Sequence, residues 1–285
     1  MKVLVTGVKG QLGYDVVKEL AKRDHHPIGV DRDEMDLMDN DAIRTFIMDL
    51  KPESIIHCAA YTAVDKAEEE VEVCYQVNAE ATKIISECAK DLDIKLIYIS
   101  TDYVFDGTKD SEYVEIDIPN PINIYGASKL KGEQYVQTLL EKYYIVRISW
   151  VFGINGNNFI KTMRGLGLER DELNIIYDEV GSPTYTADLA PLLVDMIETD
   201  KYGIYHVTNE GFCSWYEFAN EIFKQSGIEV KTNPITTDQY PTKAKRPLNS
   251  RMSKSKLKEN GFNTLPTWQQ AVYDYLNLMK QNKKE

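Results

Sequence analysis

Short apolar runs alternate with longer amphipathic segments through the first half of the chain. The apolar runs have the length of buried strands and lie at residues 3–6, 28–30, 54–58, 96–100 and 144–149. The segments between them have helical periodicity, most clearly at residues 10–23 and 71–90. This alternation predicts a parallel sheet with helices on both faces. Right-handed crossovers then place the carboxyl ends of the strands on one edge, where such sheets bind ligands.

The pattern becomes less regular after Trp150. Loops at residues 153–158 and 181–184 separate predicted helices near residues 187–198, 215–226 and 266–280. No repeat and no clean linker divides the two halves. We therefore predict an α/β protein, with a Rossmann-type doubly wound parallel sheet in residues 1–150. A smaller, interleaved lobe in residues 151–285 is expected to bind the substrate and to return elements to the main sheet.

A glycine-rich turn, TGVKGQLG at residues 6–13, follows the first predicted strand directly and opens a helix. Gly7 permits the tight turn, Gly10 lets the backbone approach a pyrophosphate, and Gly13 lets the helix pack closely on the strand. The helix N-terminus, which includes Gln11 and Leu12, offers backbone N–H groups and partial positive charge to phosphates. Residues 1–150 are therefore predicted to bind NAD or NADP.

The second predicted strand ends at Asp31, where a carboxylate can hydrogen-bond the adenosine ribose of the cofactor. Arg32 follows immediately and is suited to a 2'-phosphate instead. The two neighbours argue for different cofactors, so the choice between NAD and NADP stays open at this point.

Hydrogen-bonding side chains cluster where the fourth predicted strand ends, in STDYVFDG at residues 100–107. Tyr125 and Lys129, in YGASK, are four residues apart on a predicted helix and therefore share one face. A nearby ammonium favours the phenolate and is expected to bring the pKa of Tyr125 down from its ordinary value of about 10. If Thr101 and Tyr125 face the same cleft, Thr101 can orient a substrate carbonyl while Tyr125 protonates its oxygen.

The composition is that of an ordinary globular protein, with 285 residues of which 43% are hydrophobic. The formal net charge of -12 argues against broad binding to nucleic acid, because phosphate neutralisation needs a basic surface. No apolar run approaches the roughly 18 residues of a membrane helix, and no signal peptide is visible. The four cysteines lack CxxC spacing and are expected to be reduced packing residues. A cytoplasmic protein is therefore predicted, with no nucleic-acid or membrane partner.

Several motifs together resemble the extended short-chain dehydrogenase/reductases and, more narrowly, the dTDP-4-dehydrorhamnose reductases. They are TGxxGxxG (6–13), HCAAYTAVDKAE (57–68), STDYVFDG (100–107), YGASKLKGE (125–133), RISWVFG (147–153), DEVGSPT (178–184) and RPLNSR (246–251). The likeness covers nearly the whole chain. It implies that NADPH or NADH reduces the C4 ketone of a dTDP-linked 6-deoxy-4-keto sugar, which is the last step of dTDP-L-rhamnose formation.

The resemblance also implies residue roles. Thr101, Tyr125 and Lys129 are expected to be the catalytic trio, in which Tyr125 donates the proton and Lys129 tunes the phenol and binds the nicotinamide ribose. Cofactor contacts are expected from Asp36, Leu37, Ala59, Ala60, Tyr61 and Thr62, and also from Tyr125 and Lys129. Substrate contacts are expected from Val64, Asp102, Tyr103, Val104, Trp150, Asn158 and Arg246. Arg246 lies in a basic stretch without acids, KAKRPLNSR (243–251), where a guanidinium suits bidentate contact with a pyrophosphate; a solvated basic loop is the alternative.

Two features separate the chain from related enzymes. Sugar-nucleotide dehydratases usually place an acidic pair after the threonine, whereas here Tyr103 follows Asp102. Some family members bind magnesium through an acid in the first helix and another after the GxPT turn. Asp15 occupies the first region, but Ala187 stands in the second, which argues against a metal-bridged dimer. A monomer or weak homodimer is therefore expected.

Two other functions remain open. One is a non-catalytic, NADP-binding regulatory subunit that resembles the methionine adenosyltransferase regulatory subunit. The other is a related sugar-nucleotide epimerase or dehydratase. The intact set of Thr101, Tyr125 and Lys129 favours an enzyme, because a binding module needs no tuned phenol.

Overall fold

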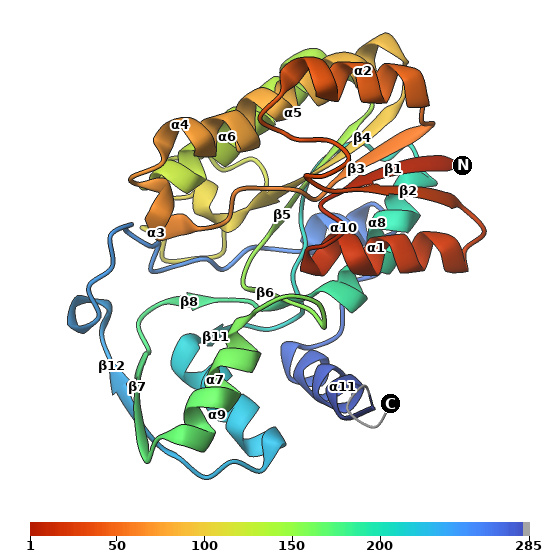
Figure 1. The fold of residues 1–285 in the computed structure, drawn as a ribbon. Helices are drawn as coiled ribbons and strands as arrows, with labels where there is room; N and C mark the ends of the chain where they lie inside the picture. Colours follow the sequence, from red (N-terminus) through yellow and green to blue (C-terminus); the bar gives the residue numbers. More distant parts are fainter. Residues whose placement is uncertain (282–285) are drawn as a thin grey trace.

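The computed structural model, which describes residues 1–281, is built around a six-stranded parallel sheet (Figure 1). The strand order is β2-β1-β3-β4-β5-β10. The strands are β1 (Lys2–Thr6), β2 (His26–Val30), β3 (Ser54–His57), β4 (Lys95–Thr101), β5 (Tyr143–Ile148) and β10 (Gly203–His206). The five apolar runs of the first half correspond to the first five of these strands. The predicted fold class, a doubly wound parallel sheet, is confirmed.

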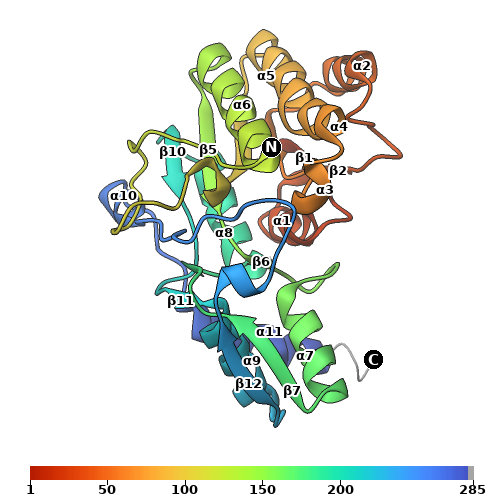
Figure 2. The same cartoon turned by 90° about the vertical axis from the view of Figure 1, so that its left-hand side faces the viewer.

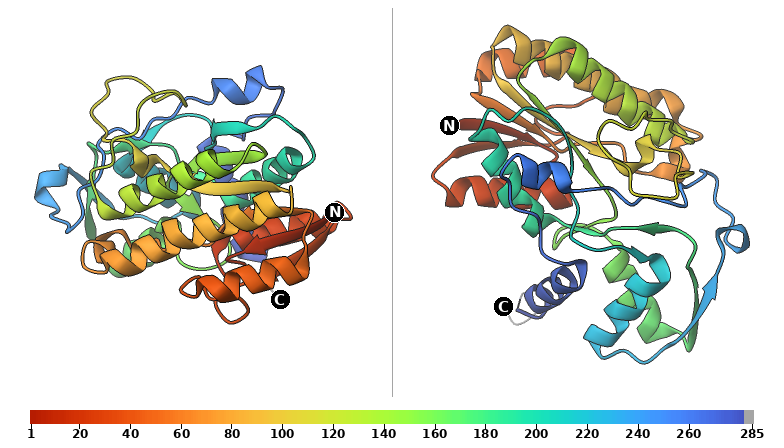
Figure 3. Two further views of the ribbon diagram at one scale, coloured as in Figure 1. Left: turned by 90° about the horizontal axis from the view of Figure 1, so that it is seen from above. Right: turned by 180° about the vertical axis from the view of Figure 1, so that it is seen from behind.

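Helices cover both faces of the sheet (Figure 2). On one face, α1 (Gln11–Lys22) and α8 (Thr186–Ile197) share a core with the sheet that includes Val5, Val16 and Leu193. On the other face, α2 (Asn40–Leu50), α5 (Ala81–Asp91) and α6 (Ile124–Leu139) lie side by side (Figure 3). Their core includes Ile43 and Ile85. The amphipathic segments therefore bury their apolar stripes against a sheet that is apolar on both faces.

The helical segment predicted at residues 71–90 is continuous but not uniform. It consists of α4 (Val71–Tyr75), a π-helical turn (Gln76–Glu80) and α5, and the short α3 (Val64–Ala67) precedes it. π-Turns often mark functional positions, since they re-aim side chains within a helix. Here the turn contains Asn78, which is 1% exposed and bonds to Tyr61 in the segment after β3.

The second half forms a smaller lobe below the carboxyl edge of the sheet. Its helices are α7 (Phe159–Glu169), α9 (Trp215–Ser226) and α11 (Trp268–Gln281), whereas the short α10 (Ser255–Glu259) packs against β10 of the main sheet. Its strand pairs are β6 (Val151–Phe152) with β9 (Thr184–Tyr185), β7 (Glu172–Ile176) with β12 (Lys231–Ile235), and β8 (Val180–Gly181) with β11 (Cys213–Ser214). Short 3-10 turns lie at Asp102–Val104 and Thr237–Gln239. Of the helices in the described chain, α7 and α10 lie outside the segments that the sequence predicts to be helical.

The two halves of the chain are interleaved. β10 pairs with β5 in the main sheet, and α8 packs against α1. In the other direction, residues 247–252 pass beside the loop that follows β4, where Tyr113 forms a bridge with Met252. A boundary near residue 150 therefore divides the sequence but not the packed layers.

Two histidines and the cysteines lie mainly in the interior. His57 is 1% exposed and His206 is 0% exposed. All four cysteines are free; three are buried and Cys58 is partly exposed. Within residues 1–281, no helix combines the length and apolar character needed to cross a membrane.

The chain reverses its direction of winding between β1 and β3. From β1 it crosses to β2 on one side and then returns to β3 on the other. Ligands bind at such switch points, outside the carboxyl ends of the two central strands. At this point Thr6 Oγ1 lies 2.7 Å from His57 Nδ1 and accepts the backbone N–H of Ala59 at 3.0 Å. The first residues after β1 and β3 are thereby held together.

Close packing of the glycine loop on α1 leads to a stability prediction. A Cβ atom at Gly13 would lie 2.4 Å from the carbonyl oxygen of Gly7. Gly13→Ala should therefore lower the free energy of unfolding by about 1–3 kcal/mol, as measured by urea denaturation. The control is Gly165→Ala in α7, where the added Cβ meets nothing within 4 Å. It should raise stability by about 0.5–1 kcal/mol through helix propensity. Equal effects of the two substitutions would contradict the packing argument.

Candidate active site

Two adjoining cavities lie over the carboxyl edge of the sheet. The first, about 710 Å³, is lined by the glycine loop and by the ends of β3, β4 and β5. The second, about 370 Å³, lies beyond the end of β2 and shares Gly7, Asp31, Ala59 and Ala60 with the first. A continuous elongated ligand with a polar middle fits this arrangement.

The glycine loop has the geometry that phosphate binding requires. Gly7 has a φ of +72°, and a Cβ atom there would lie 2.8 Å from the backbone of Ala59. The N–H of Gly7 donates to Val30 at 2.9 Å, which ties the turn to β2. Gly10 is the N-cap of α1 and has no side chain to occupy the first N–H groups of the helix. These groups are therefore available to a diphosphate.

Gln11 connects the loop to the smaller lobe. Its Oε1 atom accepts the N–H of Gly153 at 2.8 Å and the amide of Asn158 at 3.1 Å. Leu12 lines the cavity beside it, whereas Gly13 is inside the loop–helix contact and does not line it. The second lobe is thus fixed to the part of the chain predicted to hold the cofactor.

The second cavity is lined by most of the residues that were predicted to bind the cofactor outside the glycine loop and α6. They are Asp31, Arg32, Asp36, Leu37, Ala59, Ala60 and Tyr61. Asp31 accepts the N–H of Lys9 at 3.0 Å and that of Arg32 at 2.9 Å. The side chain of Arg32 is 78% exposed, with Nε 3.5 Å from Asp36. The carboxylate of Asp31, which suits a ribose hydroxyl, and the guanidinium of Arg32, which suits a 2'-phosphate, are therefore both present. The choice between NAD and NADP remains open.

Thr101, Asp102 and Tyr103 line the first cavity at the end of β4. Thr101 donates to Asp102 Oδ1 at 2.9 Å and accepts the N–H of Tyr103 at 3.2 Å. Asp102 is 4% exposed, and its Oδ2 atom has no hydrogen-bond partner among the described residues. Burial raises the pKa of Asp102 to about 6, against hydrogen bonding that favours the carboxylate. A buried acid that titrates near neutrality therefore adjoins the expected reaction centre.

Tyr125 and Lys129 line the same cavity from α6. The Tyr125 ring meets that of Tyr103 edge-on, with 5.6 Å between the centroids. Lys129 is 2% exposed; its Nζ atom donates to the carbonyl of Ile99 at 2.7 Å and lies 4.0 Å above the ring of Tyr98. The structure therefore brings the three predicted catalytic residues to one cavity.

The expected lowering of the Tyr125 pKa is wrong. Burial raises the pKa of the phenol, and only a hydrogen bond with Thr101 opposes this effect. Burial also lowers the pKa of Lys129 to about 7, although Glu133 opposes the shift. The i, i+4 spacing brings Lys129 onto the correct face but does not reveal that its charge is directed to a strand carbonyl. Desolvation, which depends on tertiary packing, outweighs the charge effect.

Asn78 and Ser128 support the site and were missed in the sequence. Asn78 accepts the N–H of Tyr61 at 2.8 Å and donates to its carbonyl at 3.1 Å and to Ser128 Oγ at 3.0 Å. These contacts hold the segment after β3, including Thr62 of the cavity wall, near α6. Ser128 lies within YGASK, which was a usable signal; nothing in the spacing points to Asn78.

Two predicted substrate residues do not reach the cavity. Val104 is 0% exposed and packs with Phe105, Tyr113 and Met252. Asn158 caps α7 by accepting the N–H of Lys161, and its amide donates to Gly153 at 2.8 Å. The structure does not support these two assignments, because both side chains are used in packing or capping.

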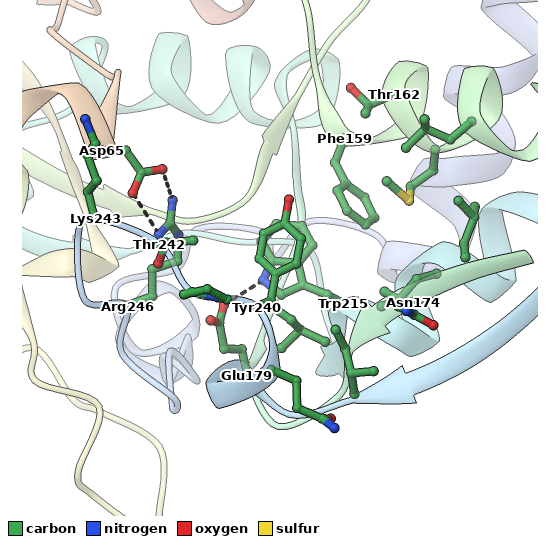
Figure 4. A pocket seen from close by; sticks show the side chains of 18 of the residues that line it. Asp65, Phe159, Thr162, Asn174, Glu179, Trp215, Tyr240, Thr242, Lys243 and Arg246 are labelled. Atoms are coloured by element: carbon green, nitrogen blue, oxygen red, sulfur yellow. Dashed lines mark hydrogen bonds and ion pairs between the residues drawn. The ribbon is translucent and has the colours of Figure 1, made fainter.

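A third cavity, about 1120 Å³, lies between α3 and the smaller lobe (Figure 4). Arg246 lies in its wall, and its guanidinium makes two contacts with Asp65, at 2.7 and 3.2 Å. Trp215 lines both this cavity and the first one, and it stacks on Trp150 with 3.6 Å between the centroids. Its indole N–H donates to the buried Glu179 at 3.0 Å. Trp215 and Glu179 were not found by sequence reasoning.

The region that holds magnesium in some family members is occupied by protein contacts. Asp15 accepts the hydroxyl of Thr186 at 2.5 Å, and Asp188, which follows Ala187, accepts the amide of Asn209 at 2.7 Å. In the part of the chain that the structure describes, no group of three or more His, Cys, Asp or Glu side chains is arranged to hold a metal ion.

Burial of Asp102 leads to a prediction about pH. Because its folded pKa is raised from 3.8 to about 6, its contribution to stability is complete below pH 3.8 and is lost as the pH rises through 6. Relative to the native protein, Asp102→Asn should therefore gain up to about 3 kcal/mol in unfolding free energy between pH 3.5 and 7.5.

The control is Asp106→Asn in the same loop. Hydrogen bonds from Asn120, and also from Thr108 and Tyr113, hold the pKa of Asp106 well below its usual range. Its contribution is lost as the pH falls, so this variant should lose stability relative to the native protein as the pH rises. The unfolding free energy of each variant relative to the native protein is obtained from denaturation curves at several pH values. If it changes with pH in the same direction for both variants, the opposite pKa shifts of Asp102 and Asp106 are contradicted.

Comparison with known proteins identifies the family of this chain. The family model described as RmlD substrate binding domain matches residues 1–281. The dTDP-4-dehydrorhamnose reductase of Aggregatibacter actinomycetemcomitans is 41% identical, with 95% of this chain and 97% of the relative covered.

Two solved dTDP-4-dehydrorhamnose reductases have the same fold. The Bacillus anthracis protein, in complex with NADP, gives a TM-score of 0.94 at 42% identity, with 96% of this chain and 98% of that chain covered. The Clostridium acetobutylicum protein gives 0.96 at 41% identity, with coverage of 98% and 100%. The family model and these relatives match the chain in sequence and fold over nearly its full length, so this chain belongs to the dTDP-4-dehydrorhamnose reductase family.

Proposed function

We propose that this protein uses NADPH or NADH to reduce the C4 ketone of dTDP-4-dehydro-6-deoxy-L-mannose, which yields dTDP-L-rhamnose. The observation that carries the proposal is the single cavity in which Thr101, Tyr125 and Lys129 meet the glycine loop. Membership of the reductase family supports the choice of substrate.

The two adjoining cavities are the proposed dinucleotide site. The N–H groups at the start of α1 bind the diphosphate, and Asp31 or Arg32 binds the adenosine ribose or its phosphate. The glycine loop and the predicted ribose residues line these cavities, so the residues present fit such a cofactor. When bound, the nicotinamide supplies the hydride.

The chain's own residues supply and control the proton. Tyr125 donates its phenolic proton to the oxygen that forms at C4, and Thr101 holds that oxygen through its hydroxyl. Thr101 donates to Asp102 in the free protein, so substrate must compete for this hydroxyl. Lys129 is held by Ile99 at the base of the cavity, from which its ammonium stabilises the phenolate that remains.

The sugar and nucleotide are proposed to occupy different chambers. Val64, Asp102, Tyr103 and Trp150 line the chamber next to the trio and are the proposed sugar contacts. The nucleotide would extend past Trp215 into the larger cavity, where Arg246 adjoins the diphosphate path. Because Asp65 already pairs with Arg246, the diphosphate has to share or replace that contact.

A reductase is favoured over elimination, since Asp102 is followed by Tyr103 and not by a second acid. A cytosolic monomer or weak homodimer remains our prediction for the working protein.

Tyr125→Phe tests the proposed proton donor. With dTDP-4-dehydrorhamnose, oxidation of NADPH or NADH at 340 nm should fall by about 10²- to 10⁴-fold in kcat, because the general acid is lost. Cofactor affinity, measured by NADPH fluorescence, should stay close to native. Comparing the two cofactors in the native protein decides the preference that Asp31 and Arg32 leave open.

The matched control is Tyr135→Phe on the same helix. Tyr135 does not line the cavity, and its hydroxyl donates to Glu80 at 3.0 Å. The kcat of this variant should equal that of the native protein. Tight cofactor binding by the native protein without sugar-dependent oxidation would refute the reductase and favour a regulatory subunit. Sugar conversion without net cofactor consumption would indicate an epimerase or dehydratase.

A further inference from the structure

A fully buried ion pair lies between α6 and the main sheet. Glu133 on α6 is 0% exposed and Arg147 on β5 is 1% exposed. Arg147 donates through Nε at 2.9 Å and through a terminal nitrogen at 2.7 Å, one bond to each carboxylate oxygen. Ser100 on β4 donates to the same carboxylate at 2.5 Å. One carboxylate therefore joins α6 to two adjacent strands.

These contacts are adjacent to the proposed catalytic trio in both elements. Ser100 immediately precedes Thr101, and Glu133 lies one helical turn beyond Lys129. Between them, Lys129 Nζ donates to the carbonyl of Ile99 at 2.7 Å. The end of β4 and the catalytic face of α6 are thus tied at successive positions.

The backbone of α6 approaches its neighbours too closely to move freely. A Cβ at Gly126 would lie 2.1 Å from the carbonyl oxygen of Tyr103, and one at Gly132 would lie 2.4 Å from the Tyr98 hydroxyl. At this spacing, a small shift of α6 changes the distance between the Tyr125 and Thr101 hydroxyls. A misplacement of about 1 Å is enough to reduce turnover by about 10²-fold.

Stability alone is a weak explanation for the pair. Taking two charges out of water is costly, and apolar residues of similar volume often give equal or greater stability. Bidentate contact between Arg and a carboxylate does fix orientation, which apolar contact does not.

We propose that Glu133, Arg147 and Ser100 are positioning residues, which set α6 against β4 so that Tyr125 and Lys129 face Thr101 in reactive geometry. The inference rests on the proposed function, because it assigns these residues to the reduction step.

The pair also provides a carboxylate that raises the pKa of Lys129 against the effect of burial. The other groups around the ammonium are Cys74 from α4, His57 and Cys58 from the end of β3, and Tyr98 from β4. Burial raises the pKa of Cys58 to about 12 and lowers that of His57 to about 3, so both are neutral near pH 7. Glu133 therefore opposes the effect of burial on the pKa of Lys129. The positive charge of Arg147 is paired with Glu133.

The first test is the double variant Glu133→Met/Arg147→Met, assayed with dTDP-4-dehydrorhamnose. We expect a folded protein that unfolds close to the native temperature, with kcat at least about tenfold lower and the sugar KM within about threefold of native. Ser100→Ala should lower kcat by about three- to tenfold.

The control is Lys142→Met, which removes an exposed ion pair with Asp93 and should leave kcat at its native value. A folded double variant with kcat within threefold of native would overturn the proposal; if it does not fold, Ser100→Ala with native kcat does so.

The second test is the pH profile of Glu133→Gln, which leaves Arg147 uncompensated. Loss of the carboxylate lowers the Lys129 pKa further, so the loss of kcat at high pH should move to lower pH. An unshifted profile would overturn this part of the proposal.

Failure of the proposed function is detected separately. A native protein that oxidises neither cofactor with this sugar refutes the reductase. In that case NADPH affinity against pH, in native protein and Glu133→Gln, still reports on Lys129. The same shift to lower pH supports the positioning role, and no shift overturns it.

Discussion

The parallel alignment of β1, β3, β4 and β5 is the constraint on which the rest of the structure depends. Because every strand runs the same way, Thr6, His57 and Thr101 all finish at one edge of the sheet. Each crossover helix then starts at that edge, which brings the amino ends of α1 and α6 to the same place. A change in the direction of any of these strands would separate the glycine loop from Thr101.

The smaller lobe completes the site by covering this edge. Gln11 bonds to the segment after β6, and Trp150 stacks on Trp215 of α9. Trp150 has a φ of +48°, an unusual value for a non-glycine residue, at the point where the chain leaves β5 for the second lobe. The unusual backbone conformation therefore coincides with the wall between the two proposed substrate chambers.

Enclosure determines the electrostatics of the site. Asp102 and Lys129 are both nearly free of solvent, and in each case burial is the main cause of the pKa shift toward neutrality. One is an acid whose pKa rises and the other a base whose pKa falls, as expected when the charged form of each is penalised. The same low-dielectric environment makes the pairing of Glu133 with Arg147 necessary, because an uncompensated charge there is strongly destabilising.

The sequence by itself determined the sheet, the glycine loop and the three residues Thr101, Tyr125 and Lys129. Periodicity, glycine spacing and motif order are local properties, and local properties are what a sequence displays directly. Only the tertiary structure decided the direction of the Tyr125 pKa, the capping role of Asn158 and the pairing of Arg246 with Asp65. These depend on burial and on partners far away in the chain, which residue spacing does not encode. The supporting roles of Asn78 and Trp215 were also visible only in the tertiary structure, because their contacts form when distant elements pack together.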